Sequence, residues 1–323
     1  MEYKKLSLLD CIMLIMGSMI GSGIFIVPAA MSRDLGSPLM LILAWVATAL
    51  LTVMAALSYG ELGAMFPRAG GQYVYLRQAY NKLFGFLYGW TLFTVIQTGT
   101  IAAVAVAFAK FSGVFFPVIS DSNFLFKIGP VHLQTQQLLG IIVVWILTFS
   151  NFRSIKSGAF VQNVFTFTKI GAVLFLIGAG LYHAFTQETA PVDWSLPSGT
   201  FSLGFWGIFC AAMVGSIFSA DAWNNITFTG SEIDKPERNL PLSLAIGTLA
   251  VSVIYIFINW VYIQAIPFDA IQNADNDRVG TLLMQTVFGN AGMFLMAALI
   301  MISTFGCING LTLSGARVYY AMA

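Results

Sequence analysis

The feature that most constrains this chain is a run of small residues inside its first long apolar stretch. The run is Gly17-Ser18-Met19-Ile20-Gly21-Ser22-Gly23-Ile24-Phe25, and apolar residues flank it on both sides. A bilayer core tolerates unpaired backbone groups only where they line a protein cavity or water. The glycines and serines therefore favour a helix that is broken inside the membrane, with amides and carbonyls left for a ligand. The run equally fits a close contact between two helices, because small residues let helices approach in lipid.

Composition places the whole chain in a membrane. It has 323 residues, of which 58% are hydrophobic and only 9% are charged. A soluble globular protein carries roughly a quarter charged residues, so we expect a polytopic membrane protein. The formal net charge is +1 and no basic cluster occurs, which argues against a nucleic-acid partner. The three cysteines all lie in apolar runs, so no disulfide framework is indicated.

Apolar stretches of about 20 residues, the length that a spanning helix needs, occur eight times. The predicted spans cover residues 8–31, 38–64, 83–109, 134–151, 157–183, 202–231, 241–265 and 291–322. Two long polar connections, Ala184–Thr200 and Pro267–Asn290, are expected on the same side of the membrane. The sequence thus predicts an all-α polytopic protein with a single transmembrane domain over residues 1–323.

The basic residues of the short loops predict the orientation, because cytoplasmic loops carry the excess of Lys and Arg. With the N-terminus in the cytoplasm, ten basic residues fall inside and four outside. The inner ones are Lys4, Lys5, Arg68, Arg77, Lys82, Arg153, Lys156, Lys235, Arg238 and Arg317, and the outer ones are Arg33, Lys110, Lys127 and Arg278. We therefore expect both ends of the chain in the cytoplasm.

A second interruption lies in the sixth predicted span. The segment Ser216–Asn225 contains a carboxylate, an indole and two side-chain amides where lipid-facing residues would be apolar. Interruptions at corresponding positions of two halves are typical of transporters built from inverted repeats. The first and sixth spans correspond if each repeat has five helices. The predicted repeats are residues 8–183 and an incomplete second repeat, 202–323.

The eighth predicted span carries small residues at helical spacing. Ser303, Gly306, Gly310 and Ser314 form a narrow stripe, which predicts a packing face against the broken first span. Asn309 beside this stripe could form a hydrogen bond across the contact.

Five ordered segments resemble motifs of the amino acid–polyamine–organocation superfamily. They are Gly17–Phe25, Gly60–Tyr75, Phe218–Asn224, Glu232–Pro241 and Ala316–Ala323. The resemblance is to the bacterial branch of L-type and serine/threonine exchanger-like permeases. It implies a LeuT-type inverted-repeat fold with broken helices one and six. Members usually have twelve spans, so we expect this chain to be part of a longer permease, truncated after helix eight.

The resemblance implies secondary active transport of neutral L-amino acids across the bacterial plasma membrane by alternating access. Sodium-independent exchange is the favoured mode, with proton-coupled symport or amino-acid sensing without transport as alternatives. No cofactor or metal is expected. Animal light chains of this family carry a cysteine between helices three and four that bonds to a heavy chain. Residues Phe111–Leu133 contain none, so no disulfide-linked heavy chain is expected.

An enzyme is a poor fit to the sequence. His132 and His183 are the only histidines, and neither belongs to an HExxH motif. No cysteine and histidine cluster has the spacing of a metal site, and no phosphate-binding Gly-rich loop occurs. The sequence therefore predicts neither an enzyme nor an ATP-driven pump.

The two breaks would bind the two charged ends of an amino acid. A helix N-terminus presents unpaired amides and a partial positive charge, which suits a carboxylate. By resemblance, Ser22 and Gly23 would hold the carboxylate, while carbonyls near the sixth-helix break would accept from the ammonium. The full predicted substrate-binding set is Met19, Ile20, Gly21, Ser22, Gly23, Phe218, Ser219, Ala220, Asp221 and Asn224. Phe218 is also expected to close over the substrate.

Two ionisable residues in the spans have several interpretations, because charge inside a membrane is costly and often functional. Lys169 in the fifth span could form a structural ion pair or a hydrogen bond at a broken helix. By resemblance it takes the place of a sodium ion and ties helix one to helix eight; alternatively it carries the proton of a symporter. We favour the tether. Asp221 could face the substrate ammonium, cap the second half of helix six, or pair with a lysine.

Overall fold

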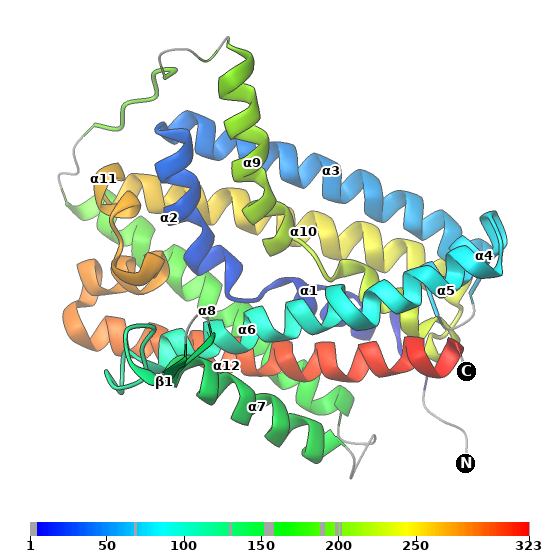
Figure 1. The fold of residues 1–323 in the computed structure, drawn as a ribbon. Helices are drawn as coiled ribbons and strands as arrows, with labels where there is room; N and C mark the ends of the chain where they lie inside the picture. Colours follow the sequence, from blue (N-terminus) through cyan, green and yellow to red (C-terminus); the bar gives the residue numbers. More distant parts are fainter. Residues whose placement is uncertain are drawn as a thin grey trace.

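The structure is a computed structural model that describes residues 5–67, 70–128, 131–151, 158–187, 191–197, 200 and 202–322. The described chain is a bundle of helices with one two-stranded hairpin (Figure 1). The α-helices are α1 (Leu8–Met19), α2 (Gly23–Leu35), α3 (Pro38–Met65), α4 (Gln72–Ala79), α5 (Lys82–Thr91), α6 (Gln97–Ser112), α7 (Thr135–Asn151), α8 (Gly158–Thr186), α9 (Leu203–Ser219), α10 (Pro236–Ala265), α11 (Phe268–Gln272) and α12 (Val279–Met322). The remaining elements are the π-helical segment η1 (Leu92–Ile96), the 3₁₀ segments η2 (Trp223–Glu232) and η3 (Asp275–Asp277), and strands β1 (Phe124–Ile128) and β2 (Val131–Gln134).

The described helices confirm a polytopic membrane protein, although one predicted span is short. Six helical stretches are long and apolar enough to cross a membrane, and the bent pair α1 and α2 makes a seventh. The fourth predicted span, 134–151, is the apolar helix α7, which falls below the length of the others. At about 1.5 Å per residue its 17 residues reach roughly 25 Å, less than a typical 30 Å hydrocarbon core.

The connection predicted over Pro267–Asn290 is more ordered than expected, and that prediction was wrong. It contains α11 and η3, and α12 already begins at Val279. The predicted start of the last span, residue 291, coincides instead with a kink at Gly289, whose φ of 63° lies in the left-handed region. The polar cluster Asp275–Arg278 and the short helix α11 led to the loop prediction, although the start of α12, Val279–Phe288, is mostly apolar.

Local signals explain the ends of the first helices. Ser7 and Asp10 form a capping box, in which the Ser7 hydroxyl accepts from the Asp10 amide and the Asp10 carboxylate accepts from the Ser7 amide. Helix α2 ends at Gly36, whose φ of 63° is accessible to glycine without a Cβ penalty. Helix α3 follows at once with Pro38 in its first turn, where the missing amide costs nothing.

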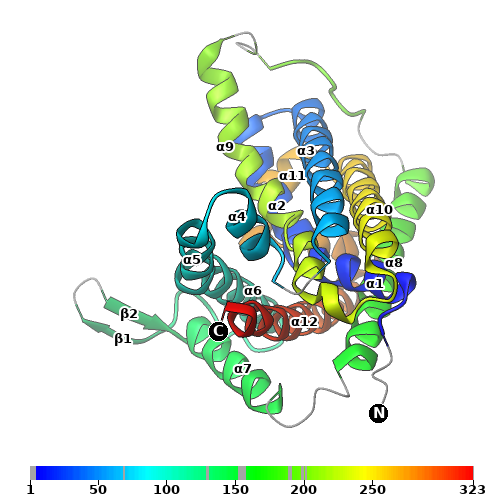
Figure 2. The same cartoon turned by 90° about the vertical axis from the view of Figure 1, so that its right-hand side faces the viewer.

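The broken helix lies in the centre of the bundle. Helix α1 packs on α8, α10 and α12, while α2 packs on α9, α11 and α12 (Figures 1 and 2). The start of α1 and the end of α12 lie at one end of the bundle, and α11 and the β-hairpin lie at the opposite end, called the distal end below. The shared side of the two ends agrees with the predicted topology. Of the basic residues behind the predicted orientation, Lys4, Arg68, Arg153 and Lys156 lie outside the described residues.

Two features of the fold had no counterpart in the sequence predictions. Strands β1 and β2 pair antiparallel between the third and fourth spans, and this hairpin projects sideways from the bundle (Figure 2). The third span contains the π-helical turn η1, between α5 and α6. Neither changes the position of the broken helices.

Candidate functional site

The first predicted break is present, between α1 and α2. Helix α1 ends at Met19 and α2 begins at Gly23, with a bend of 43° between them. The amides of Ser22, Gly23 and Ile24 make no hydrogen bond within the described part of the chain. The first amides of a helix lack intrahelical partners and carry a partial positive charge. This end of α2 can therefore bind a carboxylate.

The carbonyls at the end of α1 are satisfied in a different way, by side chains from other helices. A helix end leaves its last carbonyls without intrahelical donors, and burying them unpaired would be costly. The donors and acceptors are Lys169 Nζ to Gly17 O at 2.6 Å, Cys307 Sγ to Ser18 O at 3.7 Å, Tyr255 Oη to Met19 O at 2.8 Å and Ser303 Oγ to Ile20 O at 3.4 Å. Helices α8, α10 and α12 thus hold the broken end in place.

Tyr255 of α10 connects the two breaks. Its hydroxyl donates to Met19 O and also lies 3.3 Å from Ser219 O, the last residue of α9. The Tyr255 hydroxyl also interacts with the Gly21 amide. The Tyr255 side chain is 2% exposed, and its ring lies nearly perpendicular to that of Trp45, with 5.5 Å between ring centroids. A hydroxyl has one proton and two lone pairs, so Tyr255 can serve both a carbonyl and an amide at once.

The second predicted break is also present. Helix α9 ends at Ser219, and the chain resumes as the 3₁₀ segment η2 at Trp223. Between them, Ala222 has a φ of 70°, a left-handed conformation that is strained for a residue with a Cβ. Such a conformation persists only where the surrounding packing enforces it.

The two breaks touch at Gly23 and Ser219. A Cβ built on Gly23 would lie 2.2 Å from Ser219 Oγ and 3.0 Å from Ser219 Cα, so only glycine fits there. The run therefore contains both a helix break and a close helix contact, at different residues, while ligand binding at the break stays a prediction. Gly21 and Ser22 lie in the break, whereas Gly23 is a close contact between two helices.

The predicted ammonium acceptors are not equally available. Phe218 O accepts from the Asp221 amide at 3.3 Å, and Ser219 O lies near Tyr255. The Phe218 ring is 45% exposed beside the break, whereas Ile20 is fully buried. Asn224 is half-buried at the start of η2, and its carbonyl accepts from Thr227 Oγ1 at 2.7 Å. The structure brings these residues together, and their role in binding stays a prediction.

Lys169 makes the contact with α1 that the tether prediction requires. It is 1% exposed, and its ammonium donates to Gly17 O on α1. It also interacts electrostatically with Cys307 of α12. The Lys169 side chain from α8 therefore bonds to α1, whereas its link to α12 and its effect on transport stay predictions.

Asp221 does not cap the second half of its helix. The residue at the cap of η2 is Ala222, and no side chain caps that end. The Asp221 carboxylate instead interacts with the adjacent Ala222 amide and, electrostatically, with Tyr88 of α5. The ion pairs among the described residues do not include Asp221. Facing a substrate ammonium and pairing with a lysine both stay predictions.

Sequence reasoning missed Tyr255 and Cys307. A signal for Tyr255 existed, since Ser252, Tyr255 and Asn259 fall on one face of an otherwise apolar span. A polar face in a spanning helix marks the side that packs on protein. Cys307 lies in an apolar run and gave no such signal.

Comparison with known proteins gives consistent matches along the whole chain. A family model described as amino acid permease matches residues 6–323. The chain is 31% identical over 320 residues to the serine/threonine exchanger SteT of Bacillus subtilis (strain 168), covering 99% of this chain and 68% of that protein. It is 28% identical to the human b(0,+)-type amino acid transporter 1, covering 98% of this chain and 62% of that protein. It is also 28% identical to the large neutral amino acids transporter small subunit 2 of Oryctolagus cuniculus, covering 99% of this chain and 58% of that protein.

Proposed function

The chain belongs to the amino acid permease family, and we propose that it carries neutral L-amino acids by sodium-independent exchange. Family membership and the apolar helices make it a multi-pass membrane protein. The chain spans about three-fifths to two-thirds of the length of the relatives it matches. Transport and its substrates are proposed here for the protein that contains this chain.

The observation that carries the proposal is the contact between two broken helices with opposite backbone dipoles. Amides of Ser22–Ile24 face the break from the start of α2, and carbonyls of Met19 and Ser219 face it from the ends of α1 and α9. A zwitterion needs both kinds of group at one place. A free amino acid matches this arrangement through its backbone alone. The selection of neutral side chains is inferred from the apolar side chains of Met19, Ile20 and Phe218 beside the breaks.

Lys169 supports independence from sodium. A fixed ammonium on α8, bonded to Gly17 O at 2.6 Å, already supplies the cation that a broken first helix needs. No added ion is then required to hold α1 against α8 and α12. The relatives named as exchangers or transporters fit the same mode of action.

We further propose that the distal end faces the outside of the cell, so that both chain ends are cytoplasmic. The support is the distribution of basic residues along the sequence, which places ten on the side of the chain ends and four on the distal side. Labelling of a cysteine placed at Leu125 in the exposed hairpin, with an impermeant reagent on intact cells, tests the orientation. Labelling only after the cells are permeabilised would place the distal end in the cytoplasm instead.

Transport measured in proteoliposomes tests the proposed function. Exchange predicts uptake of labelled amino acid that requires unlabelled amino acid inside and does not respond to sodium. Uptake into empty vesicles that follows an imposed pH gradient would identify a proton symporter. Saturable binding without uptake under any gradient would identify a sensor.

The place of the carboxylate needs a variant that leaves the packing intact. Gly23→Val, the obvious choice from sequence, would collide with Ser219 and disturb both helices. Ser22→Ala removes only a hydroxyl, and we expect affinity to fall about tenfold, as for a hydrogen bond to a charged group. Ser32→Ala is the matched control, because the Ser32 hydroxyl bonds to Pro28 O within α2. Equal affinity in both variants would place the carboxylate elsewhere.

A further inference from the structure

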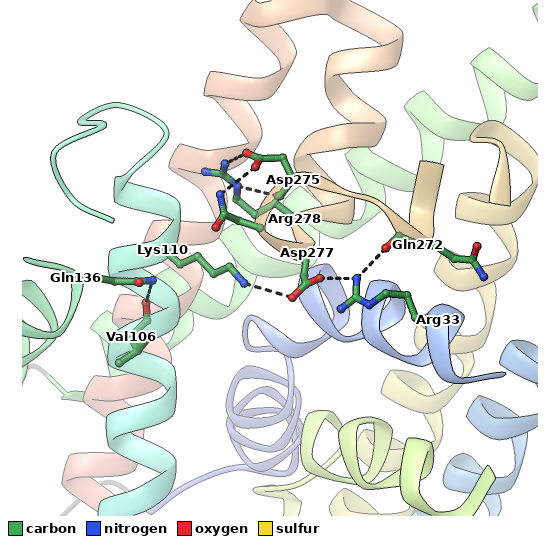
Figure 3. A network of polar contacts seen from close by, with 9 residues as sticks. Arg33, Val106, Lys110, Gln136, Gln272, Asp275, Asp277 and Arg278 are labelled. Atoms are coloured by element: carbon green, nitrogen blue, oxygen red, sulfur yellow. Dashed lines mark hydrogen bonds and ion pairs between the residues drawn. The ribbon is translucent and has the colours of Figure 1, made fainter. Parts of the chain in front are cut away.

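One carboxylate at the distal end links three separate elements. Asp277 of η3 lies between Arg33 of α2 and Lys110 of α6 (Figure 3). Its two oxygens are 2.8 Å from Arg33 Nη1 and 3.7 Å from Lys110 Nζ. Along the chain, α2 and α6 are separated by α3, α4, α5 and η1, so no short linker joins them. The shared carboxylate therefore joins elements that could otherwise move independently.

The break and its 43° bend mean that α2 does not continue α1 as one rigid helix. Arg33 lies ten residues after Gly23, which places it about 15 Å along the helix from the break. Its guanidinium also donates to Gln272 O at 2.7 Å, and the Gln272 amide donates to Ser32 O at 2.8 Å. The distal end of α2 is thus held by the connection between α10 and α12, far from the substrate-binding residues.

The backbone of this connection is strained where the carboxylate sits. Asn276 and Asp277 both have positive φ, 51° and 58°, although neither is glycine. Two successive residues in the left-handed region are uncommon, and they persist where surrounding contacts enforce them. The ion pairs of Asp277 are contacts of that kind. Breaking them would release the strained turn.

We propose that Asp277 is a latch that keeps the distal side of the pathway closed by tying α2 and α6 to η3. The proposal rests on the proposed transport function, because a latch matters only if α2 moves during a cycle. Opening the distal side requires the outer half of the broken helix to separate from its neighbours. Each transport cycle then breaks the contacts of Asp277 and forms them again.

The charges around Asp277 explain why its carboxylate would decide whether the distal side is closed or open. With Asp277 present, both cations are attracted to η3. Without its charge, Arg33 and Lys110 face each other as like charges, so the force between α2 and α6 changes from attraction to repulsion. The pairs are partly exposed, with the Asp277 side chain 31% exposed, so water and salt weaken them. We expect loss of the latch to raise the ratio of distal-open to distal-closed protein roughly two- to tenfold.

Distances between spin labels test the latch without any transport measurement. Cysteines at Asp34, at the distal end of α2, and at Phe116, just after α6, place labels on two exposed sites outside the latch. Cys210→Ser removes the exposed native cysteine. In Asp277→Asn the longer-distance population should rise, whereas Asp275→Asn should match the parent. Asp275 is the control because its side chain is 82% exposed and its partners in the described part of the chain, Asn276 and Arg278, are local and lie on neither α2 nor α6.

The design separates failure of the latch from failure of the transport proposal. Unchanged distances in Asp277→Asn overturn the latch even if the protein transports amino acids. Should that variant not fold, Arg33→Gln removes the shorter pair from the other side and must shift the same population, or the latch is rejected. In the transporting protein, Asp277→Asn should lower the KM for substrate on the distal side two- to tenfold, with Asp275→Asn unchanged. No transport in the parent would reject the proposed function and leave the distance test valid.

Discussion

Replacement of Tyr255 by phenylalanine tests whether the two breaks depend on a side chain from a third helix. The change removes one oxygen from a fully packed position and leaves the ring contact with Trp45 in place. Met19 O loses its 2.8 Å donor, and Ser219 O loses a donor at 3.3 Å. Tyr255→Phe therefore removes hydrogen bonds at the two breaks without changing the packing of the ring.

The magnitude follows from the number of groups left unpaired. A buried donor or acceptor without a partner costs about 1–3 kcal/mol, and the hydroxyl proton serves one carbonyl at a time. We expect the free energy of unfolding to fall by about 2 kcal/mol, which lowers the melting temperature by a few degrees. If the same loss bears on the substrate-bound arrangement, affinity falls about 30-fold. A carbonyl has two lone pairs, so Met19 O can accept from Tyr255 and from a substrate ammonium together.

Isothermal titration of a neutral amino acid into purified protein measures the affinity, and a thermal scan measures stability. Tyr262→Phe is the matched control, since Tyr262 is also buried on α10 and its hydroxyl lies 3.4 Å from Ile24 O inside α2. We expect the control to bind substrate normally. If Tyr255→Phe keeps parental affinity and melting temperature, the hydroxyl does not hold the breaks and the reasoning fails.

Two further substitutions test the contacts around the first break. Lys169→Met should lower the transport rate about tenfold. Its stability should change little, because removing a buried charge offsets the lost hydrogen bond to Gly17 O. An unchanged transport rate in proteoliposomes would show that Lys169 does not act as a tether. Gly23→Ala should lower the melting temperature, because its Cβ would lie 2.7 Å from Ser219 Cβ, and adding Ser219→Gly should restore it. Failure of the double variant to recover would mean that the close contact lies elsewhere.

The sequence predicted the two breaks because interruptions in apolar runs are visible without coordinates. Glycines, serines and an aspartate in spans one and six have a cost in lipid that only a cavity or a protein contact offsets. Lys169 stood out for the same reason. The polar segment Pro267–Asn290 was misread as a loop, because short helices such as α11 carry no hydropathy signal of their own.

Tertiary structure alone decided which groups complete the site. The caps of the first break come from Lys169, Tyr255, Ser303 and Cys307, between 152 and 289 residues away along the chain from the carbonyls they serve. Hydrogen bonds of this kind depend on how helices cross, which no local pattern of residues encodes. The sequence by itself determined a membrane protein with two broken helices, because burial of polar groups in lipid is a local cost. The partners that offset this cost, and the shared carboxylate of Asp277, were decided by packing between distant segments.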